Sequence, residues 1–303
     1  MPLTIAAGVD GSPESAAAAE WAAREAELRG LALRLVHVAE PVPDPLARAA
    51  GLGAWTPGER SGRGERIPRE AAEGIRLRHP GVEVTPQQRA GHPAEALIGV
   101  AGESELLVLG SRGLSGVGGF LVGSVGLAVV AHAERPVVLV RGGDRAADAR
   151  TADSPSSPFS TAPYRPVVLG LDLGDEAAAV IEFAFEEAAV RETTLRVVHG
   201  WYPPPAFEGL TIGPAVHVEH ARRRATALTE ALHPWRRKFP AVRIVEASRP
   251  GRPASQLIEA SRTACLVVVG RRTRRGPVGT RLGSVAHAVL HHAAAPVAVV
   301  PHD

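Results

Sequence analysis

A glycine-rich loop between two apolar runs is the part of the sequence best suited to chemistry. Gly110, Gly113, Gly123 and Ser124 lie in the stretch GSRGLSGVGGFLVGS. Glycine allows positive φ angles and lets backbone N–H groups approach an anion closely. A serine just before a helix can cap the first N–H groups of that helix and donate to a phosphate. The loop therefore indicates a phosphate cradle, and the alternative is a surface loop without a ligand.

Two other polar positions follow apolar runs. Asp10 comes directly after TIAAGV, and His37 and Val38 end the run ALRLVHV. Asp10 can accept a hydrogen bond from an adenine amino group or a ribose hydroxyl, or it can simply close a turn. His37 is interpreted as a structural, hydrogen-bonded histidine. The glycine loop has no Gly-Lys-Ser/Thr and follows a later strand, so it is neither a P-loop nor a dinucleotide-binding fingerprint.

The same pattern occurs twice in the chain, as in a tandem duplication. Equivalent positions are Asp10 and Asp172, His37 and His199, Gly110 and Gly270, Gly123 and Gly283, and Ser124 and Ser284. In the second copy the inner glycine is replaced by Thr273, and arginines surround it. A positive φ at a β-branched residue would cost about 1–3 kcal/mol, whereas arginines match phosphate oxygens well. Weakened binding and arginine-assisted binding therefore both stay open.

Short apolar runs alternate with helical patterns in both halves. We expect strands at 3–9, 32–38, 82–87, 105–110, 136–141, 166–172, 194–199, 242–247, 264–270 and 296–301. Helices are expected at 13–29, 64–79, 93–103, 123–133, 175–191, 215–238, 253–262 and 283–293. Runs such as Leu106–Leu109 are apolar throughout, which is typical of strands with helices on both faces. The alternation predicts an α/β fold with open parallel sheets.

The domain organisation follows from the repeat and from composition. Residues 143–164 are rich in Ala, Asp, Ser, Pro and Thr, so they have little to bury and are expected to form a linker. The linker separates a first domain, 1–142, from a second, 165–303. A length of 303 residues is sufficient for two such domains, each with its own core.

Composition excludes several classes of protein. The net charge is +2, and no basic stripe with interleaved aromatics is present, so we expect no nucleic-acid partner. We expect no membrane association, because no apolar run approaches the roughly 18 residues that span a bilayer. We also expect no secretory signal, so the expected location is cytoplasmic. The single Cys265 is expected to be buried in a strand. His287 with His291, and His217 with His220, lack an obvious third ligand, so no metal site is expected.

With these residues in place, the first half resembles a universal stress protein (UspA-like) domain of the ATP-binding type. That family's Gly-x2-Gly-x9-Gly-Ser/Thr motif is matched by Gly110, Gly113, Gly123 and Ser124. The opening Val9-Asp10-Gly11-Ser12 and the final Arg135–Val140 also fit. The second half repeats the pattern in register, so the resemblance covers essentially the whole chain as two tandem domains.

The resemblance implies two tandem five-stranded parallel sheets of order 3-2-1-4-5, as in adenine-nucleotide alpha-hydrolase-like folds. It also implies that paired domains pack through their last strands, here as an intramolecular pseudo-dimer, while homo-oligomers of the tandem unit stay open. ATP would lie across the ends of strands 1, 2 and 4. The implied contacts in the first domain are Gly8, Asp10, Val38, Gly110, Arg112, Gly113, Gly123, Ser124 and Val125, and those kept in the second are Asp172, Gly270, Gly283 and Ser284.

We therefore expect a cytoplasmic protein that binds ATP, with or without Mg²⁺, mainly in its first domain. It would take part in stress response or signalling through nucleotide-dependent conformation or through contacts with unidentified signalling proteins. No catalytic residue is expected, and ATP hydrolysis would be weak at most. Two alternatives stay open: a slow ATPase or nucleotidyl-transfer enzyme that uses the same pocket, and a scaffold that binds no nucleotide.

Overall fold

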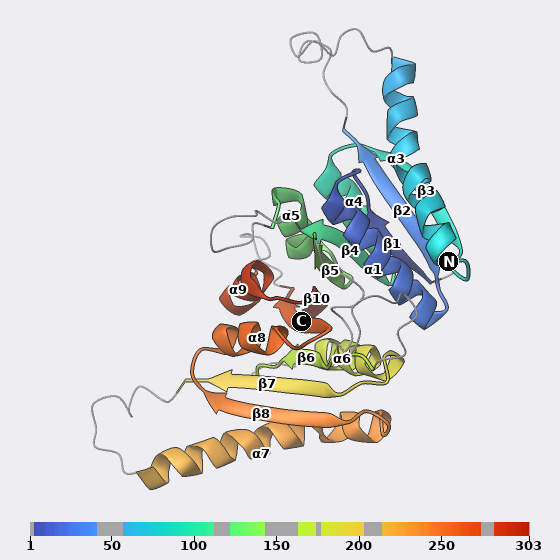
Figure 1. Cartoon of the computed structure of the whole chain (residues 1–303). Coiled ribbons are helices and arrows are strands. Elements are labelled where there is room, and N and C mark those ends of the chain that lie inside the picture. Colours follow the sequence, from blue (N-terminus) through green and yellow to red (C-terminus); the bar gives the residue numbers. More distant parts are fainter. Residues whose placement is uncertain are drawn as a thin grey trace. The chain divides into compact units, whose positions relative to one another are not determined.

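The computed structural model describes residues 3–40, 57–111, 122–142, 163–173, 177–202, 214–273 and 282–302. The chain divides into two compact units, Met1–Asp144 and Arg145–Asp303 (Figure 1). The expected linker at 143–164 lies almost wholly outside the described residues.

In the first unit, parallel strands alternate with helices. The strands are β1 (Thr4–Gly8), β2 (Ala32–Ala39), β3 (Val84–Ala90), β4 (Leu106–Ser111) and β5 (Val137–Arg141). The helices are α1 (Pro13–Arg29), α3 (Pro57–Arg78), α4 (Pro93–Gly102) and α5 (Ser124–His132). Adjacent strands are hydrogen-bonded in the order β3-β2-β1-β4-β5.

The second unit repeats this arrangement. Its strands are β6 (Val167–Gly170), β7 (Leu195–Trp201), β8 (Ile244–Pro250), β9 (Leu266–Arg272) and β10 (Val297–His302). Its helices are α6 (Ala178–Val190), α7 (Pro214–Lys238), α8 (Pro253–Ser261) and α9 (Ser284–His292). The strand order is β8-β7-β6-β9-β10. The α/β class, the parallel direction and the order 3-2-1-4-5 within each unit are thus confirmed. The prediction of two separate five-stranded sheets is not confirmed.

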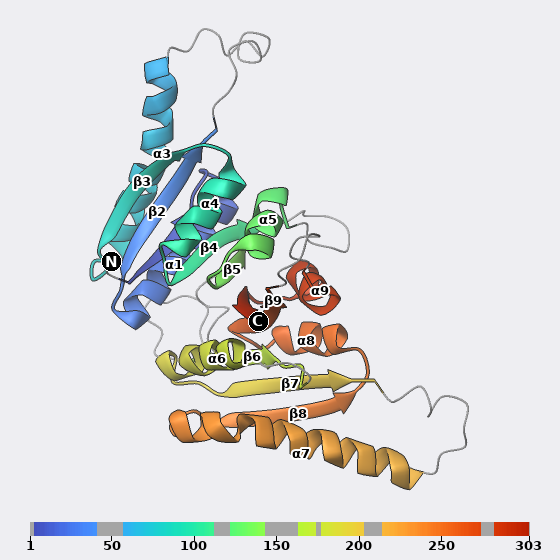
Figure 2. The ribbon, with the colours of Figure 1, turned by 180° about the vertical axis from the view of Figure 1, so that it is seen from behind.

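Helices cover both faces of the strands in each unit. In the first unit α1 and α3 pack on one face, and α4 and α5 pack on the other (Figures 1 and 2). The central strand β4 is correspondingly buried along its apolar run, and no side chain from Leu106 to Leu109 is more than 5% exposed. Burial on both faces explains why this run shows no alternation of apolar and polar residues. The predicted burial of Cys265 is also confirmed.

Helix α1 has the predicted boundaries because both of its ends carry strong local signals. Ser12 is the N-cap, and its Oγ accepts a hydrogen bond from the Ser15 N–H at 3.2 Å. Pro13 starts the helix, where its missing N–H would have had no partner. At the other end, Gly30 adopts a left-handed φ of 64° and donates to the carbonyls of Ala26 and Glu27.

Other boundaries differ from those predicted. α3 begins at Pro57 and not at 64, because the segment PGERSGR has no apolar periodicity from which a helix could be recognised. α6 begins at Ala178, and not at the expected 175. The strand β3 extends beyond its apolar part to Ala90, because it pairs with β2 as far as Ala39. None of the described helices is both long and apolar enough to cross a membrane.

A charged cluster joins α1 to the end of α3. The Nε2 atom of His79 lies 2.8 Å from Glu20 Oε1, and its Nδ1 atom lies 3.2 Å from Glu27 Oε2. Arg78 Nε donates to Glu20 Oε2 at 3.0 Å. Burial by itself would raise the pKa of Glu20, but the hydrogen bonds from His79 and Arg78 and the nearby charge of Arg24 outweigh it and hold that pKa below its ordinary value of 4.5.

We expect Glu20→Gln to destabilise the first unit by about 1 kcal/mol at pH 7, because a charge-assisted bond becomes a neutral one. A carboxylate whose folded-state pKa is lowered stabilises the fold above its unfolded-state pKa, and this contribution is lost as the pH falls through the folded-state pKa. The variant and the wild type should therefore converge as the pH falls below about 4.5. The measurement is urea unfolding at several pH values, with hydrogen exchange of α1 peptides to identify the first unit.

The matched control is Glu73→Gln, which removes an exposed carboxylate on α3 that makes no hydrogen bond or ion pair with the described residues. Its effect should be close to zero at every pH. An equal effect of both substitutions, or a Glu20→Gln deficit that persists at low pH, would contradict the role of this cluster.

Candidate functional site

The predicted residues of the first unit lie where its strands end. Asp10 follows β1, Val38 is the second-last residue of β2, and Gly110 is in the last part of β4. Gly123, Ser124 and Val125 lie at the start of α5. All of them are therefore at the carboxyl edge of parallel strands, the edge at which open α/β sheets bind ligands. Arg112 and Gly113 lie outside the described residues, so their roles stay predictions.

Asp10 shapes the entry to α1. Its Oδ1 atom accepts hydrogen bonds from the Ser12 N–H at 2.9 Å and from the Ser12 hydroxyl at 2.5 Å. The turn-closing role considered from the sequence is therefore present. The side chain is also exposed at the strand end. A carboxylate has several acceptor positions, so closing a turn and binding a ligand are compatible roles.

Two predicted glycines have packing reasons of their own. A Cβ atom on Gly110 would lie 2.5 Å from the carbonyl carbon of Glu14 and 2.8 Å from the amide nitrogen of Ser15. A Cβ atom on Gly8 would lie 2.6 Å from Leu109 Cδ2. Neither Gly110 nor Gly8 has a positive φ. The conformational freedom that we expected of Gly110 is thus not what its position requires, since the first turn of α1 lies directly against it.

Among the described residues, no side chain caps the first turn of α5 or of α9. Their N-cap residues are Gly123 (φ −61°, ψ 156°) and Gly283 (φ −61°, ψ 151°), and neither helix has a side-chain cap. A Cβ atom on either glycine would meet nothing within 4 Å. The prediction that Ser124 caps α5 is wrong, because Ser124 is already the first helical residue. The first N–H groups of such a helix and the positive end of its dipole favour a bound phosphate.

The two repeated histidines are structural, as predicted. Nδ1 of His37 lies 2.8 Å from the Val9 carbonyl, and Nδ1 of His199 lies 3.0 Å from the Leu171 carbonyl. A carbonyl can only accept, so Nδ1 carries the proton in both rings. Each histidine thereby fixes the backbone just before the aspartate of its copy.

The second unit contains a cavity of about 620 Å³ at its carboxyl edge. It brings together all four predicted residues of this copy: Asp172, Gly270, Gly283 and Ser284. Arg271 and Arg272 line it too, and both were considered as phosphate ligands from the sequence. The cavity is large enough for a nucleotide-sized ligand.

Sequence reasoning missed Arg224 and His302, whose side chains also line this cavity. Arg224 lies on α7, and only the packing of that helix on β8 brings it to the cavity. Trp201 also lines the cavity and is 7% exposed, so it forms part of the wall. His302 covers Gly270, where a Cβ atom would lie 2.8 Å from its Nε2 atom. Its only sequence signal was its place at the end of the last strand.

Thr273 does not carry the expected strain. It has no positive φ, and both its N–H and its Oγ1 donate to the His302 carbonyl, at 2.7 and 3.1 Å. The threonine therefore ties the end of β9 to the end of β10. The substitution of the inner glycine costs the second copy no backbone strain at this position.

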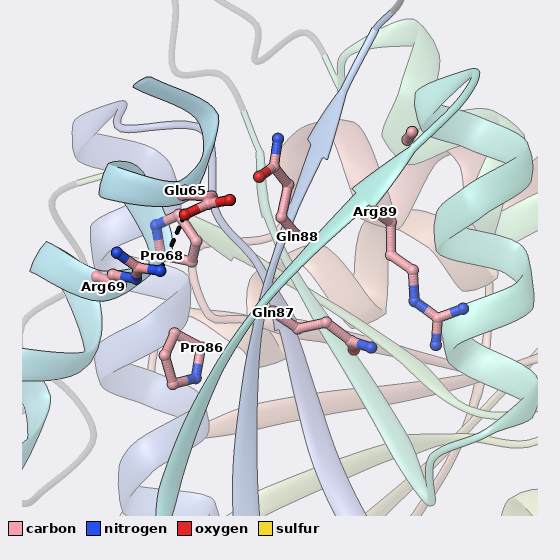
Figure 3. A pocket seen from close by; sticks show the side chains of 8 residues that line it. Glu65, Pro68, Arg69, Pro86, Gln87, Gln88 and Arg89 are labelled. Carbon is pink, nitrogen blue, oxygen red and sulfur yellow. Dashed lines mark hydrogen bonds and ion pairs between the residues drawn. The ribbon is translucent and has the colours of Figure 1, made fainter. Parts of the chain in front are cut away.

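The first unit has another depression, of about 390 Å³, between α3 and the edge strand β3 (Figure 3). Its wall includes an ion pair in which Arg69 lies 2.9 Å from Glu65, and both side chains are largely exposed. Gln87, Gln88 and Arg89 contribute from β3. None of the predicted site residues lines it, and exposed ion pairs of this kind contribute little.

Comparison with known proteins agrees with the geometry. Residues 1–141 and 163–301 match the model of the Universal stress protein family. Universal stress protein Rv1996 of Mycobacterium tuberculosis is 32% identical over 322 residues, covering 99% of this chain and 96% of that protein. A universal stress protein of Mycolicibacterium smegmatis is 33% identical over 305 residues, covering 98% and 96%. The crystal structure of one from Archaeoglobus fulgidus superimposes with a TM-score of 0.70 at 16% identity, covering 99% of this chain and 98% of that one, and shows the same fold.

We expect Gly110→Ala to destabilise the first unit by about 1–3 kcal/mol, because the added methyl group would overlap backbone that cannot move independently of α1. Gly81→Ala is the matched control, since a Cβ atom there meets nothing within 4 Å, and it should change stability by about 0.5 kcal/mol or less. Differential scanning calorimetry measures both. Equal melting temperatures of the two variants would refute the packing role of Gly110.

Proposed function

Because the chain belongs to the universal stress protein family, we propose that it binds nucleotides at the carboxyl edge of its strands, with an adenine nucleotide in its first unit. The phosphates would lie against the uncapped first turns of α5 and α9, and the nucleoside would lie toward Asp10 and Asp172. The observation that carries this proposal is the cavity of the second unit, where all four repeated residues and two arginines meet.

The residues present fit a phosphate chain. Gly283 leaves the first N–H groups of α9 without a side-chain cap, and Ser284 adds an exposed hydroxyl beside them. Arg271 and Arg272 supply positive charge from β9. Guanidinium groups pair with phosphate oxygens in a fixed fork. Backbone donors, a hydroxyl and two cations together are the set that phosphate binding needs.

Our finer proposal is that ATP, with or without Mg²⁺, binds mainly in the first unit. Support comes from the sequence motif, which is complete only there: Gly113 is kept in the first copy and replaced by Thr273 in the second. The nucleotide would be bound rather than turned over, and it would act in stress signalling through conformation or partner proteins. The cytoplasmic location and the pairing of the two units through their last strands stay predictions.

Two substitutions test this placement without weakening the fold. Gly123→Asp and Gly283→Asp each introduce a preferred N-cap residue whose carboxylate stabilises the helix and repels phosphate. We expect each variant to melt at or above the wild-type temperature and to lose at least about tenfold in ATP affinity at its own unit, a change of roughly 1.4 kcal/mol. Isothermal titration calorimetry with ATP measures affinity and stoichiometry.

The matched controls are Gly123→Asn and Gly283→Asn, which provide the cap without the charge and should retain more affinity. Wild-type protein that binds no ATP would support the scaffold alternative and refute the proposal. Robust Mg²⁺-dependent release of phosphate, lost in Gly123→Asp, would favour the ATPase alternative. Unchanged binding in both Asp variants would mean that the phosphates lie elsewhere.

A further inference from the structure

One wall of the second cavity has no equivalent in the first unit. In the first unit Gly64, Gln88 and Ala39 are neighbours: a Cβ atom on Gly64 would lie 2.4 Å from Gln88 Nε2 and 3.7 Å from Ala39 Cβ. α3 ends at Arg78 and α7 ends at Lys238. Gly64 and Arg224 lie the same number of residues before these helix ends, so they are equivalent positions. Strand register places Ser248 opposite His199, as Gln88 is opposite His37. Trp201 follows two residues after His199, where the first unit has Ala39.

The indole of Trp201 is held in place from two sides. Its Nε1 atom donates to Ser248 Oγ at 3.2 Å, and the His220 ring meets it edge-on with ring centroids 4.9 Å apart. Tyr202, the next residue, is 62% exposed and also lines the cavity. Rigid aromatic side chains of this kind stack on flat heterocycles. This wall therefore suits a nucleobase.

Arg224 adds a guanidinium group to the same wall of the cavity. It is half-buried and lines the cavity, yet it has no hydrogen bond or ion pair with the described residues. By contrast, its neighbour Arg223 lies 3.0 Å from Glu219. Strand order sets the position of Arg224: α7 packs on β8, whereas α9 packs on β9 and β10, with β7 and β6 between. Arg224 is thus at the end of the cavity away from the phosphate-binding turn of α9.

We propose that the cavity of the second unit selects guanine nucleotides, and that Arg224 is the residue that sets this selectivity. The proposal rests on the proposed function for the position of the phosphates at α9. With the phosphates there, the base lies against Trp201 and within reach of Arg224. The guanidinium carries only donors. Guanine offers two adjacent acceptors, O6 and N7, to such a fork, whereas adenine offers the N6 amino donor beside N7.

Asp172 complements this choice. It lines the cavity at the end of β6, between the α7 side and the α9 side. Its carboxylate only accepts when ionised. Guanine has donors at N1 and N2 on its Watson–Crick edge, so an arginine and an aspartate together satisfy two edges of guanine. In the first unit the equivalent of Arg224 is Gly64, so that copy carries no cation at this position.

The test uses the full chain carrying Gly123→Asp, which blocks phosphate binding in the first unit and leaves the second to be titrated. Calorimetry with GTP and with ATP should show GTP binding at least about tenfold more tightly. Adding Arg224→Ala should weaken GTP binding by roughly tenfold to a hundredfold, the range for one bidentate contact to a base, and leave ATP within about threefold. Arg223→Ala is the matched control: it removes the same charge from the same helix and should leave both affinities unchanged.

Several outcomes overturn the proposal. ATP binding as tightly as GTP would refute guanine selectivity while the proposed function stands. An equal loss of ATP and GTP in Arg224→Ala would mean that the residue contacts phosphate and does not read the base. GTP binding that persists unchanged in Arg224→Ala would remove Arg224 from the site. Failure of every nucleotide to bind, in the wild type as well, would instead be a failure of the proposed function.

Discussion

The parallel direction of the strands is the constraint on which the rest of the structure depends. A chain that must start each new strand at the same edge returns through a crossover, usually a helix. Because the crossovers are right-handed and the strand order reverses at the first strand of each unit, the helices cover both faces. The same constraint gathers all strand ends at one edge. Asp172, Gly270 and Gly283 are far apart in sequence yet line one cavity for this reason. Fold and site are therefore consequences of the same geometric rule.

The two copies meet this constraint with different side chains. In the first unit Gly110 accepts the backbone of α1, and Gly142 lies under Glu14, whose Cγ would be 2.8 Å from a Cβ at 142. In the second unit the residue equivalent to Gly142 is His302, whose ring covers Gly270 while its carbonyl holds Thr273. At this position the first unit has a glycine beside α1, and the second unit has a histidine whose ring lies over the end of β9. The cavity is reshaped, while the strand order is unchanged.

Much of the fold could be predicted from the sequence because the signals were local. The boundaries of α1 followed from Ser12, Pro13 and Gly30, which act within one turn of the helix ends. The start of α3 at Pro57 could not be predicted, since its first turns carry no apolar stripe. The repeated residues of the site were found by their spacing. Arg224 was not, because its position depends on how α7 packs on β8, and nothing in a local stretch of sequence expresses that packing.

Glycine at the N-caps of α5 and α9 has a consequence for how such a tandem chain can evolve. A single-base change turns some glycine codons into an aspartate codon, and aspartate both caps a helix better than glycine does and repels phosphate. One mutation could therefore stabilise a copy and, at the same time, abolish its binding of phosphate. Loss of binding in a duplicated domain would then need no decay of its fold and could even be favoured by selection for stability. Neither copy has taken that step, since Gly123 and Gly283 are both still present.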